Sequence, residues 1–355
     1  MKLLVLAQTP PPLHGQSVMV QTLVAGLPAR GLMVEHVNLR LSRDHADIGR
    51  WRPGKLLAVL DACAHAIKLR FTAGCDTLYY VPAPGKRGAL YRDWAVMLLC
   101  RPFFKRLVLH WHATGLGAWL DAHATAPERW LTRLLLGRAD LSLVLSGLLQ
   151  RDAAALGAKR IAVVPNGLAD PAPGERAVRE AGASFQVLFL GLCSEEKGLF
   201  AAAEAVLAAG PGFTLVAAGS FPDSVTQKRF EALCAQHPAA LRHAGPVDGT
   251  EKERLLRESS CLCLPTHYAA EGQPLVLLEA MAHDLPVIAT RWRAIPDTLP
   301  PEAILVEPGD ATALRDALLT LRRAPPAPRV FRRHYLAHFT GEQHLAALTA
   351  ALQTL

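Results

Sequence analysis

The sequence predicts an α/β protein with two domains, each a parallel sheet that helices cover on both faces. A chain of 355 residues is long enough for two domains with separate cores. Short apolar runs of strand length alternate with longer helical patterns in both halves. Between the halves, residues 168–184 are rich in Pro, Gly, Ala and charge, which is typical of a linker. Two such domains facing each other would enclose one cleft.

The first half contains six apolar runs that we expect to be strands. Their continuous apolar character is typical of parallel strands buried on both faces. The expected strands span residues 2–7, 33–38, 77–81, 107–111, 141–145 and 161–164. Helical patterns between them include residues 16–27, 55–69 and 90–99.

The same alternation restarts after the expected linker. The expected strands span residues 186–190, 213–218, 241–244, 261–265 and 285–289. The expected helices span residues 198–209, 224–236, 251–259, 276–283 and 311–323, and a last one spans 341–355 after a proline-rich stretch. We therefore expect domains over residues 1–168 and 185–325. A C-terminal helical segment over 326–355 is expected to pack back towards the first domain.

Composition and motif absences narrow the class of protein. The seven cysteines are scattered and form no C-x-x-C pair, so the sequence indicates neither a disulfide framework nor a zinc knuckle. No apolar run approaches the ~18 residues of a membrane-spanning helix. The sequence contains no P-loop, serine-hydrolase elbow, zincin motif or nucleic-acid-reading module. We expect a cytoplasmic globular protein that does not bind nucleic acid.

The net charge of +7 is unevenly distributed. Up to Asp170 there are 21 Lys and Arg against 11 Asp and Glu, whereas from Pro171 onward there are 17 against 20. A basic half attracts phospholipid or a phosphorylated acceptor, or it is an arginine-rich solvated surface. Residues 55–70 and 101–106 combine Lys and Arg with apolar side chains. These stretches either contact an anionic membrane leaflet or are ordinary helix surfaces packed on the sheet.

The most informative segment runs from Glu271 to Glu279 and follows an expected strand. Gly272, Gln273 and Pro274 are expected to open a helix, where unpartnered backbone N–H groups suit an anion or sugar oxygens. Pro274 fits the first turn, where its missing N–H costs little. Glu271 is placed to accept sugar hydroxyls, and Glu279 suits the two vicinal hydroxyls of a ribose. The alternative is a helix-capping acid and a surface glutamate.

Two further loops after expected strands carry candidate binding residues. Lys197 precedes Gly198 at an expected helix start, a position suited to a diphosphate that gains negative charge as its bond to sugar breaks. The alternative is a solvated loop lysine. In the loop at residues 10–17, Gly15 would allow close approach of the backbone to a diphosphate.

His110 and His112 lie at the end of the expected strand 107–111 and share one of its faces. A pair of histidines suits a metal ion, but no acidic third ligand is near in sequence, so the sequence requires no metal. The other interpretation that the residues themselves offer is a structural role.

These segments together resemble the retaining GT-B glycosyltransferases. That group, the glycosyl transferases group 1, includes glycogen synthases, sucrose-phosphate synthases and bacterial mannosyl- and glucosyltransferases. The resemblance is closest over residues 271–290 and extends over nearly the whole chain. It also covers Val164-Pro-Asn-Gly167, Phe189-Leu-Gly191, Lys197-Gly198, Gly245-Pro-Val247 and His110-Trp-His112. It implies the GT-B fold, in which two Rossmann-like domains face each other across a cleft.

The resemblance also implies roles for matching residues. It assigns Glu271 to the transferred sugar, Glu279 to the ribose, Lys197 to the phosphates and His112 to the sugar and phosphate region. The other implied donor-binding positions are Gly272, Gln273, Pro274, Leu275, Gly191 and Gly15. The chain departs from the family at Leu192, where an Arg is usual, and at Gln16, where a second glycine is common.

The expected activity is retaining transfer of a hexose from a nucleotide-diphosphate sugar to a glycan or lipid-linked acceptor, in cell-surface polysaccharide or lipopolysaccharide synthesis. No cofactor is expected, and the protein would be cytoplasmic or peripheral on the inner face of the membrane. Two alternatives are a nucleotide-sugar epimerase of the same fold and a non-enzymatic protein that binds a sugar nucleotide.

Overall fold

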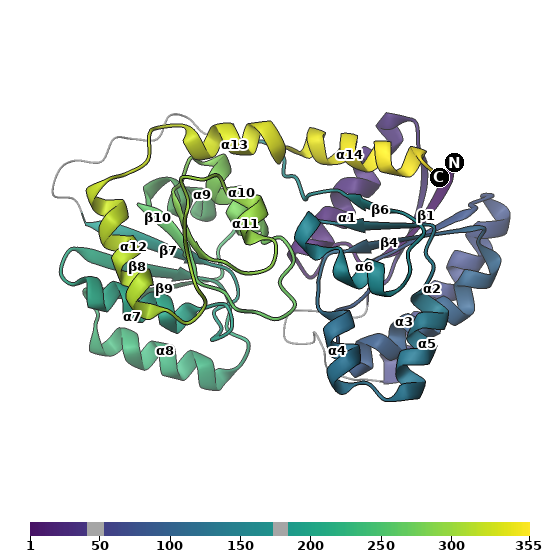
Figure 1. Ribbon diagram of the computed structural model, residues 1–355, viewed down its shortest axis with the longest axis horizontal. Coiled ribbons are helices and arrows are strands. Elements are labelled where there is room, and N and C mark those ends of the chain that lie inside the picture. Colours follow the sequence, from purple (N-terminus) through teal and green to yellow (C-terminus); the bar gives the residue numbers. More distant parts are fainter. Residues whose placement is uncertain (41–52, 173–183) are drawn as a thin grey trace. The chain divides into compact units, whose positions relative to one another are not determined.

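The computed structural model describes residues 1–40, 53–172 and 184–355 of the chain (Figure 1). The chain divides into two units. Unit 1 comprises Met1–Gly167 together with Gly341–Leu355, and unit 2 comprises Leu168–Thr340. Most of the predicted linker, residues 173–183, lies outside the described residues. Each unit contains one six-stranded sheet whose neighbouring strands are all parallel, so the predicted fold class is confirmed.

The sheet of unit 1 has the strand order β2-β1-β3-β4-β5-β6. Its strands are β1 (Lys2–Ala7), β2 (Met33–Asn38), β3 (Thr77–Tyr80), β4 (Arg106–Trp111), β5 (Leu141–Val144) and β6 (Ile161–Val163). Its helices are α1 (Gly15–Gly26), α2 (Pro53–Thr72), α3 (Arg87–Cys100), α4 (Leu116–His123), α5 (Ala126–Leu136), α6 (Arg151–Ala155) and α14 (Gly341–Gln353). Short 3-10 turns are η1 (Pro28–Arg30), η3 (Arg101–Phe103) and η4 (Gly147–Leu149).

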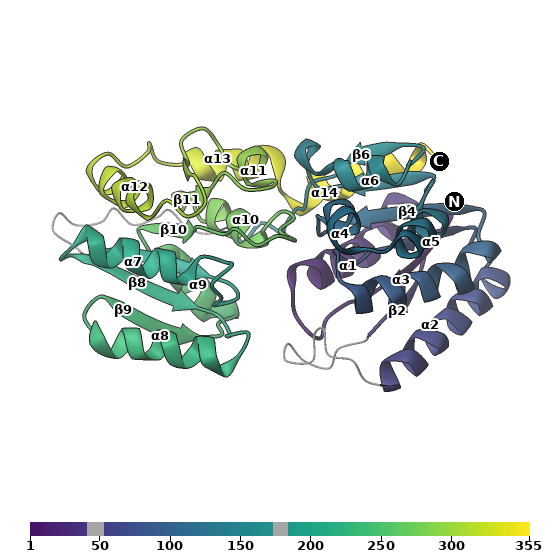
Figure 2. The same ribbon diagram turned by 60° about the horizontal axis from the view of Figure 1, so that its bottom comes forward.

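Alternation along β1 divides the core of unit 1 into two layers. Leu4 and Leu6 of β1 pack with residues of α2, α3 and α5, whereas Leu3 and Val5 pack with α1 and α14. Successive side chains of a strand point to opposite faces, so apolar residues at every position require helices on both sides. Figure 2 shows both helical layers of this unit.

The sheet of unit 2 has the strand order β12-β11-β10-β7-β8-β9. Its strands are β7 (Phe185–Leu190), β8 (Phe213–Ala218), β9 (Leu241–Gly245), β10 (Cys261–Leu264), β11 (Val287–Thr290) and β12 (Ile304–Val306). Its helices are α7 (Leu199–Ala209), α8 (Ser224–Gln236), α9 (Gly249–Glu258), α10 (Leu275–Ala282), α11 (Ile295–Thr298), α12 (Ala311–Arg323) and α13 (Val330–His338). Val187 and Phe189 pack with α7 and α12, and Leu188 and Leu190 pack with α9, α10 and α13.

The C-terminal helices are divided between the two units, whereas one segment over 326–355 was expected to pack towards the first domain. Helix α13 belongs to unit 2, where Phe331 and Tyr335 are buried against α10. Helix α14 belongs to unit 1 and buries Leu345 and Leu348 beside α1. A Cβ on Gly26 of α1 would lie 2.4 Å from Cδ1 of Leu345, so glycine permits this close packing.

Side-chain caps explain where several helices begin. Thr125 and Glu128 form a capping box at the start of α5. Asp223 accepts two backbone amides at the start of α8, and Asp310 accepts the amide of Ala313 at the start of α12. Both of the latter helices have the bounds that the sequence pattern predicted.

Candidate active site

The strand order of unit 2 reverses between β7 and β10. From β7 the chain continues outward through β8 and β9, whereas β10, β11 and β12 extend the sheet on the other side. In open parallel sheets, ligands bind at the carboxyl ends of the strands where the order reverses. Lys197 lies in the loop after β7 and Glu271 in the loop after β10. The topology therefore places both residues at the expected ligand-binding edge.

A close backbone contact brings the loop after β7 against the end of β10. Gly198 is the N-cap of α7 and has a φ of +86°. A Cβ at this position would lie 2.3 Å from the carbonyl oxygen of Pro265. Both the conformation and the contact require glycine. The contact sets where the side chain of Lys197, the preceding residue, leaves the backbone.

Thr266 links the two loops beside the candidate site. Its side chain is buried, and its hydroxyl lies 3.0 Å from Oε2 of Glu271 and 3.3 Å from the carbonyl oxygen of Glu196. The amide of His267 also donates to the Glu196 carbonyl, at 2.8 Å. These bonds fix the loop after β10 relative to the residue that precedes Lys197.

Lys197 and Glu271, 74 residues apart in sequence, form an ion pair that uses both carboxylate oxygens. Nζ lies 2.6 Å from Oε2 and 2.9 Å from Oε1. The Glu271 side chain is 6% exposed and that of Lys197 is 20% exposed. An ammonium has three donors, so one N–H of Lys197 remains for a further acceptor. The carboxylate likewise keeps lone pairs that can accept hydroxyls.

Tyr268 forms one wall beside this pair. Nζ of Lys197 lies 5.1 Å from the centre of the Tyr268 ring, within the range of a cation–π contact. Burial raises the pKa of Tyr268, and the charges of Glu196 and Glu271 raise it further. Trp292 Nε1 donates to the Tyr268 carbonyl at 2.8 Å, which fixes this part of the loop.

The expectation that Gly272, Gln273 and Pro274 open the helix was wrong in register. Helix α10 begins at Leu275, and Pro274 is its N-cap with an extended ψ of 120°. A proline in this conformation lies just outside the helix, so its missing N–H is not part of the first turn. Gln273 is buried and donates from Nε2 to Oγ1 of Thr298 at 3.2 Å, which anchors the segment before the helix.

Glu279 lies within α10, as predicted, and contacts a lysine of α9. Nζ of Lys252 is 2.8 Å from Oε1 of Glu279, and the two side chains are 30% and 21% exposed. This pair is more accessible than the Lys197–Glu271 pair. Glu279 can therefore accept hydroxyls of a ligand without leaving Lys252.

Gly191, another predicted donor-binding position, directly follows β7 beside the loop after β8. Its φ is +135°, and a Cβ on Gly219 would lie 1.7 Å from the Gly191 carbonyl oxygen. The two loops thus meet backbone to backbone. The next residue, Leu192, is 42% exposed at the position where the resemblance implies an Arg.

In unit 1, His110 and His112 lie at the carboxyl end of β4 with ring centres 4.1 Å apart. His110 is fully buried, and its Nδ1 pairs with the hydroxyl of Tyr79. Burial lowers the pKa of His110 well below its usual range and that of His112 to about 3. Among the described residues, Nε2 of each ring has no hydrogen-bond partner. Both rings are therefore neutral at physiological pH and can bind an uncharged hydroxyl.

Gly15 is the first residue of α1, at the carboxyl end of the first strand of unit 1. His14 caps this helix, because its Nδ1 accepts the amide of Ser17 at 3.2 Å. The Ser17 hydroxyl in turn accepts the His14 amide at 3.0 Å. The early amides of such a helix have no partner within the helix, so Gly15 and Gln16 lie where an anion is favoured.

Two other features of the described residues bear on the site. They contain no group of three or more His, Cys, Asp and Glu side chains arranged for a metal ion.

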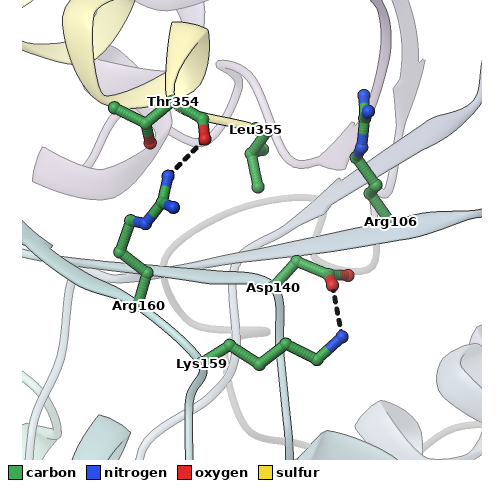
Figure 3. A pocket seen from close by; sticks show the side chains of 6 residues that line it. All are labelled: Arg106, Asp140, Lys159, Arg160, Thr354 and Leu355. Atoms are coloured by element: carbon green, nitrogen blue, oxygen red, sulfur yellow. Dashed lines mark hydrogen bonds and ion pairs between the residues drawn. The ribbon is translucent and has the colours of Figure 1, made fainter.

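A pocket of about 210 Å³ lies in unit 1, and its lining side chains are shown in Figure 3. It is lined by Arg106, Asp140, Lys159, Arg160, Thr354 and Leu355. The first four precede or begin strands, at the edge opposite to the one where parallel sheets bind ligands.

Sequence reasoning did not single out Thr266, Tyr268 or Lys252. The only signal for the first two was their position directly after a buried strand. For Lys252, the signal was a lysine in the first turns of a charged helix. Tyr268 contacts Lys197 of another loop, and Lys252 contacts Glu279 of another helix. Thr266 and Glu271 share one loop, but their contact depends on how that loop folds. Only the fold therefore reveals these contacts.

Comparison with known proteins identifies unit 2. Residues 184–323 match the sequence profile of the family Glycosyl transferases group 1. No curated protein matches the chain by sequence. Most of unit 2 therefore matches the family that the motifs resembled.

Solved structures identify the fold of the whole chain. A sucrose-phosphate synthase from Thermosynechococcus elongatus is 19% identical with a TM-score of 0.78, covering 100% of this chain and 99% of that one. Anabaena HepE in complex with UDP-glucose is 15% identical with a TM-score of 0.71 and full coverage of both chains. The lipopolysaccharide outer core galactosyltransferase WaaB is 14% identical with a TM-score of 0.71, and the match covers 100% of this chain and 99% of that one. The chain has the GT-B fold, with two Rossmann-like domains.

Proposed function

We propose that the chain is a retaining glycosyltransferase that moves a hexose from a nucleotide-diphosphate sugar to a glycan or lipid-linked acceptor. The observation that carries the proposal is the Lys197–Glu271 pair at the reversal point of a glycosyl transferases group 1 domain. HepE binds UDP-glucose and WaaB is a galactosyltransferase, which favours a hexose donor. WaaB acts on the lipopolysaccharide outer core, which favours cell-surface polysaccharide or lipopolysaccharide synthesis in the cytoplasm.

In the proposed reaction, the bond between the anomeric carbon and the diphosphate oxygen breaks, and the acceptor oxygen bonds to that carbon from the same face. The acceptor proton passes to the leaving phosphate, so no general base of the protein is needed. The remaining N–H of Lys197 stabilises the charge that develops on the diphosphate. Stabilisation of charge in the transition state is then the main contribution of the protein to catalysis.

The other candidate residues are proposed to position the donor. Glu271 accepts hydroxyls of the transferred sugar while it holds Lys197 in place. Glu279 accepts the ribose hydroxyls, and the neutral ring of His112 contacts the sugar. None of these roles requires a metal ion or a cofactor.

Turnover of variants tests the proposal. UDP-, GDP- and ADP-sugars are first screened by thermal shift, because a bound donor raises the free energy of unfolding. Donor cleavage is then measured in Lys197→Ala and Glu271→Gln, where we expect a loss of about 100-fold or more. Glu195→Gln is the matched control, because Glu195 lies in the same loop as Lys197 and its ion pair with Arg229 of α8 is exposed. Wild-type rates in both site variants would refute the proposed mechanism.

A non-enzymatic sugar-nucleotide-binding protein is a second candidate, favoured by Leu192 at the position of a usual Arg. It predicts a thermal shift with a donor but no cleavage of that donor, with or without acceptor. An epimerase would instead convert the donor sugar without any acceptor. The same assay therefore separates all three functions.

A further inference from the structure

Helices α2, α3 and α5 of unit 1 lie side by side over one face of its sheet (Figures 1 and 2). Helix α3 is in the middle and contacts the other two. Their inner sides belong to the core, where Cys63, Met97 and Leu136 are fully or almost fully buried. We call the outer side of these helices, together with the adjoining turn η3, the helical face.

The helical face carries most of the exposed large apolar side chains. The described residues include sixteen exposed large apolar side chains, and nine of these belong to α2, α3, α5 and η3. The nine include all four of the aromatic residues in that set. The nine are Leu56, Leu57, Leu60, Phe71, Tyr91, Leu98, Phe103, Trp130 and Leu134. Phe104, which follows Phe103 in the stretch 101–106, is buried instead. Such a concentration exceeds the scattered apolar residues of an ordinary surface.

The same elements are strongly basic. Residues 53–72, 87–106 and 126–136 contain ten Lys and Arg but three Asp and Glu. Two of those acids are buried: Asp93 pairs with Arg92, and Glu128 pairs with Arg87 and accepts the Tyr91 hydroxyl. Among the described residues of these segments, Asp61 is the only exposed acid.

Contacts between the elements make the helical face one connected surface. Nε of Arg70 in α2 donates to the Phe103 carbonyl of η3 at 2.7 Å, and the Phe71 and Phe103 rings meet edge to face at 6.2 Å. Arg101 donates to the carbonyls of Leu135 and Gly137 at the end of α5. Aromatic and basic side chains from separate helices are thus held in one arrangement.

We infer that the helical face binds the surface of a membrane rich in anionic phospholipid. Aromatic side chains are favoured at the level of lipid headgroups, and Lys and Arg are attracted to an anionic leaflet. A second copy of the chain would instead bring two strongly basic surfaces together. Within the parts of the chain that the structure describes, no helix has the length and hydropathy needed to cross a bilayer. The inference rests on the proposed function in one respect: binding to the membrane would bring the protein to a lipid-linked acceptor.

Flotation of the purified full chain with vesicles tests this inference. We expect binding to vesicles of phosphatidylglycerol and phosphatidylcholine that weakens with salt, and no binding to phosphatidylcholine alone. The pair Lys68→Glu and Arg133→Glu should weaken binding at least about 30-fold, since each basic residue near an anionic leaflet contributes a factor of about five. The pair Lys228→Glu and Arg257→Glu, on exposed positions of unit 2, is the matched control.

The apolar contribution is tested separately with Phe71→Ala and Trp130→Ala, which should weaken vesicle binding about tenfold. Val225→Ala, at an exposed position of α8, should not. Absence of wild-type binding to anionic vesicles, or equal binding by both charge-reversal pairs, would overturn the inference. So would a dimer in sedimentation that the Phe71 and Trp130 variants abolish. Donor cleavage measured without vesicles should be unchanged in all these variants, so failure of the surface is distinguishable from failure of the activity.

Discussion

Two donors hold the carboxylate of Glu271: Nζ of Lys197 and the hydroxyl of Thr266. Both donors bond to Oε2, whereas Oε1 is bonded by Lys197 alone. Buried acceptors of charge-assisted bonds keep one orientation, because losing a bond in a site shielded from water is costly. At the residue scale, the orientation of Glu271 is therefore set by the protein before any sugar arrives.

Replacement of Thr266 by Val tests this orientation. The substitution keeps the shape of the side chain and removes the hydroxyl bond to Glu271. Because a bond to a charged group contributes about 1.5–3 kcal/mol, we expect kcat/KM for donor cleavage to fall about 10- to 100-fold. Thr266→Ser should restore most of the activity. Equal rates in Thr266→Val and the wild type would show that the hydroxyl does not position Glu271.

The residues of the site could be predicted only in part. Lys197, Glu271 and Glu279 were recognisable because each follows a buried strand or lies in a distinctive helix-opening segment. Their partners were not, because sequence spacing does not show which atoms meet across 74 residues. The one-position error at Pro274 has a similar cause: the residue was assigned to the first turn from its type, whereas its extended ψ makes it the cap.

At the scale of elements, Gly198 links helix α7 to strand β10. Gly198→Ala should lower the free energy of unfolding by about 2–4 kcal/mol, because it combines a left-handed backbone with a steric clash against Pro265. Gly31→Ala is the matched control, since Gly31 has a similar φ of +80° but a Cβ added there would meet no atom within 4 Å. That control should cost only about 1–2 kcal/mol. Equal losses in chemical denaturation would contradict the close contact.

Elements with strong patterns were predicted almost residue for residue. Strand β8 and helices α8 and α12 have the predicted bounds, because continuous apolar runs and capping acids mark their limits. Strand β12 was missed because it has three residues and pairs only with β11 at the sheet edge. Helix α5 was also missed, and its packing against α3 is a tertiary effect. Helix α13 lies within the helical segment expected over 326–355, but its own bounds were not predicted.

At the scale of the whole molecule, buried imidazoles make unit 1 sensitive to acid. His110, His112 and His344 are largely shielded from water, and burial lowers the pKa of each. A pKa below the unfolded value of 6.5 means that the unfolded chain binds the proton first. Stability is therefore fully present above about pH 6.5 and is lost as the pH falls below that value.

Urea denaturation across this pH range measures the effect. At His112, the free energy of unfolding should fall by about 1.4 kcal/mol per pH unit below about pH 6.5. For His112 the loss should continue down to a pH of about 3. Between about pH 6.5 and pH 4.5, we expect the free energy of unfolding of His112→Asn to depend less steeply on pH than that of the wild type. The two slopes should differ by about 1.4 kcal/mol per pH unit. An identical slope in the variant and the wild type would show that His112 is not neutral in the folded protein.

The two-domain organisation was predictable because it depends on patterns repeated along the chain: strand–helix alternation, interrupted once and then resumed. The division of the C-terminal helices was not, since α13 ends at His338 and α14 begins at Gly341, yet they belong to different units. Their buried faces match different cores, which no local pattern reveals.

Calorimetric titration of the donor identified by thermal shift tests the central claim most directly, that Lys197 and Glu271 bind an activated sugar. We predict that Lys197→Ala weakens binding of that nucleotide-diphosphate sugar about 100-fold, a loss of about 2.7 kcal/mol. Glu195→Gln, which removes the exposed pair between the same loop and Arg229 of α8, should bind like the wild type. Equal affinity in Lys197→Ala and the wild type would contradict the account.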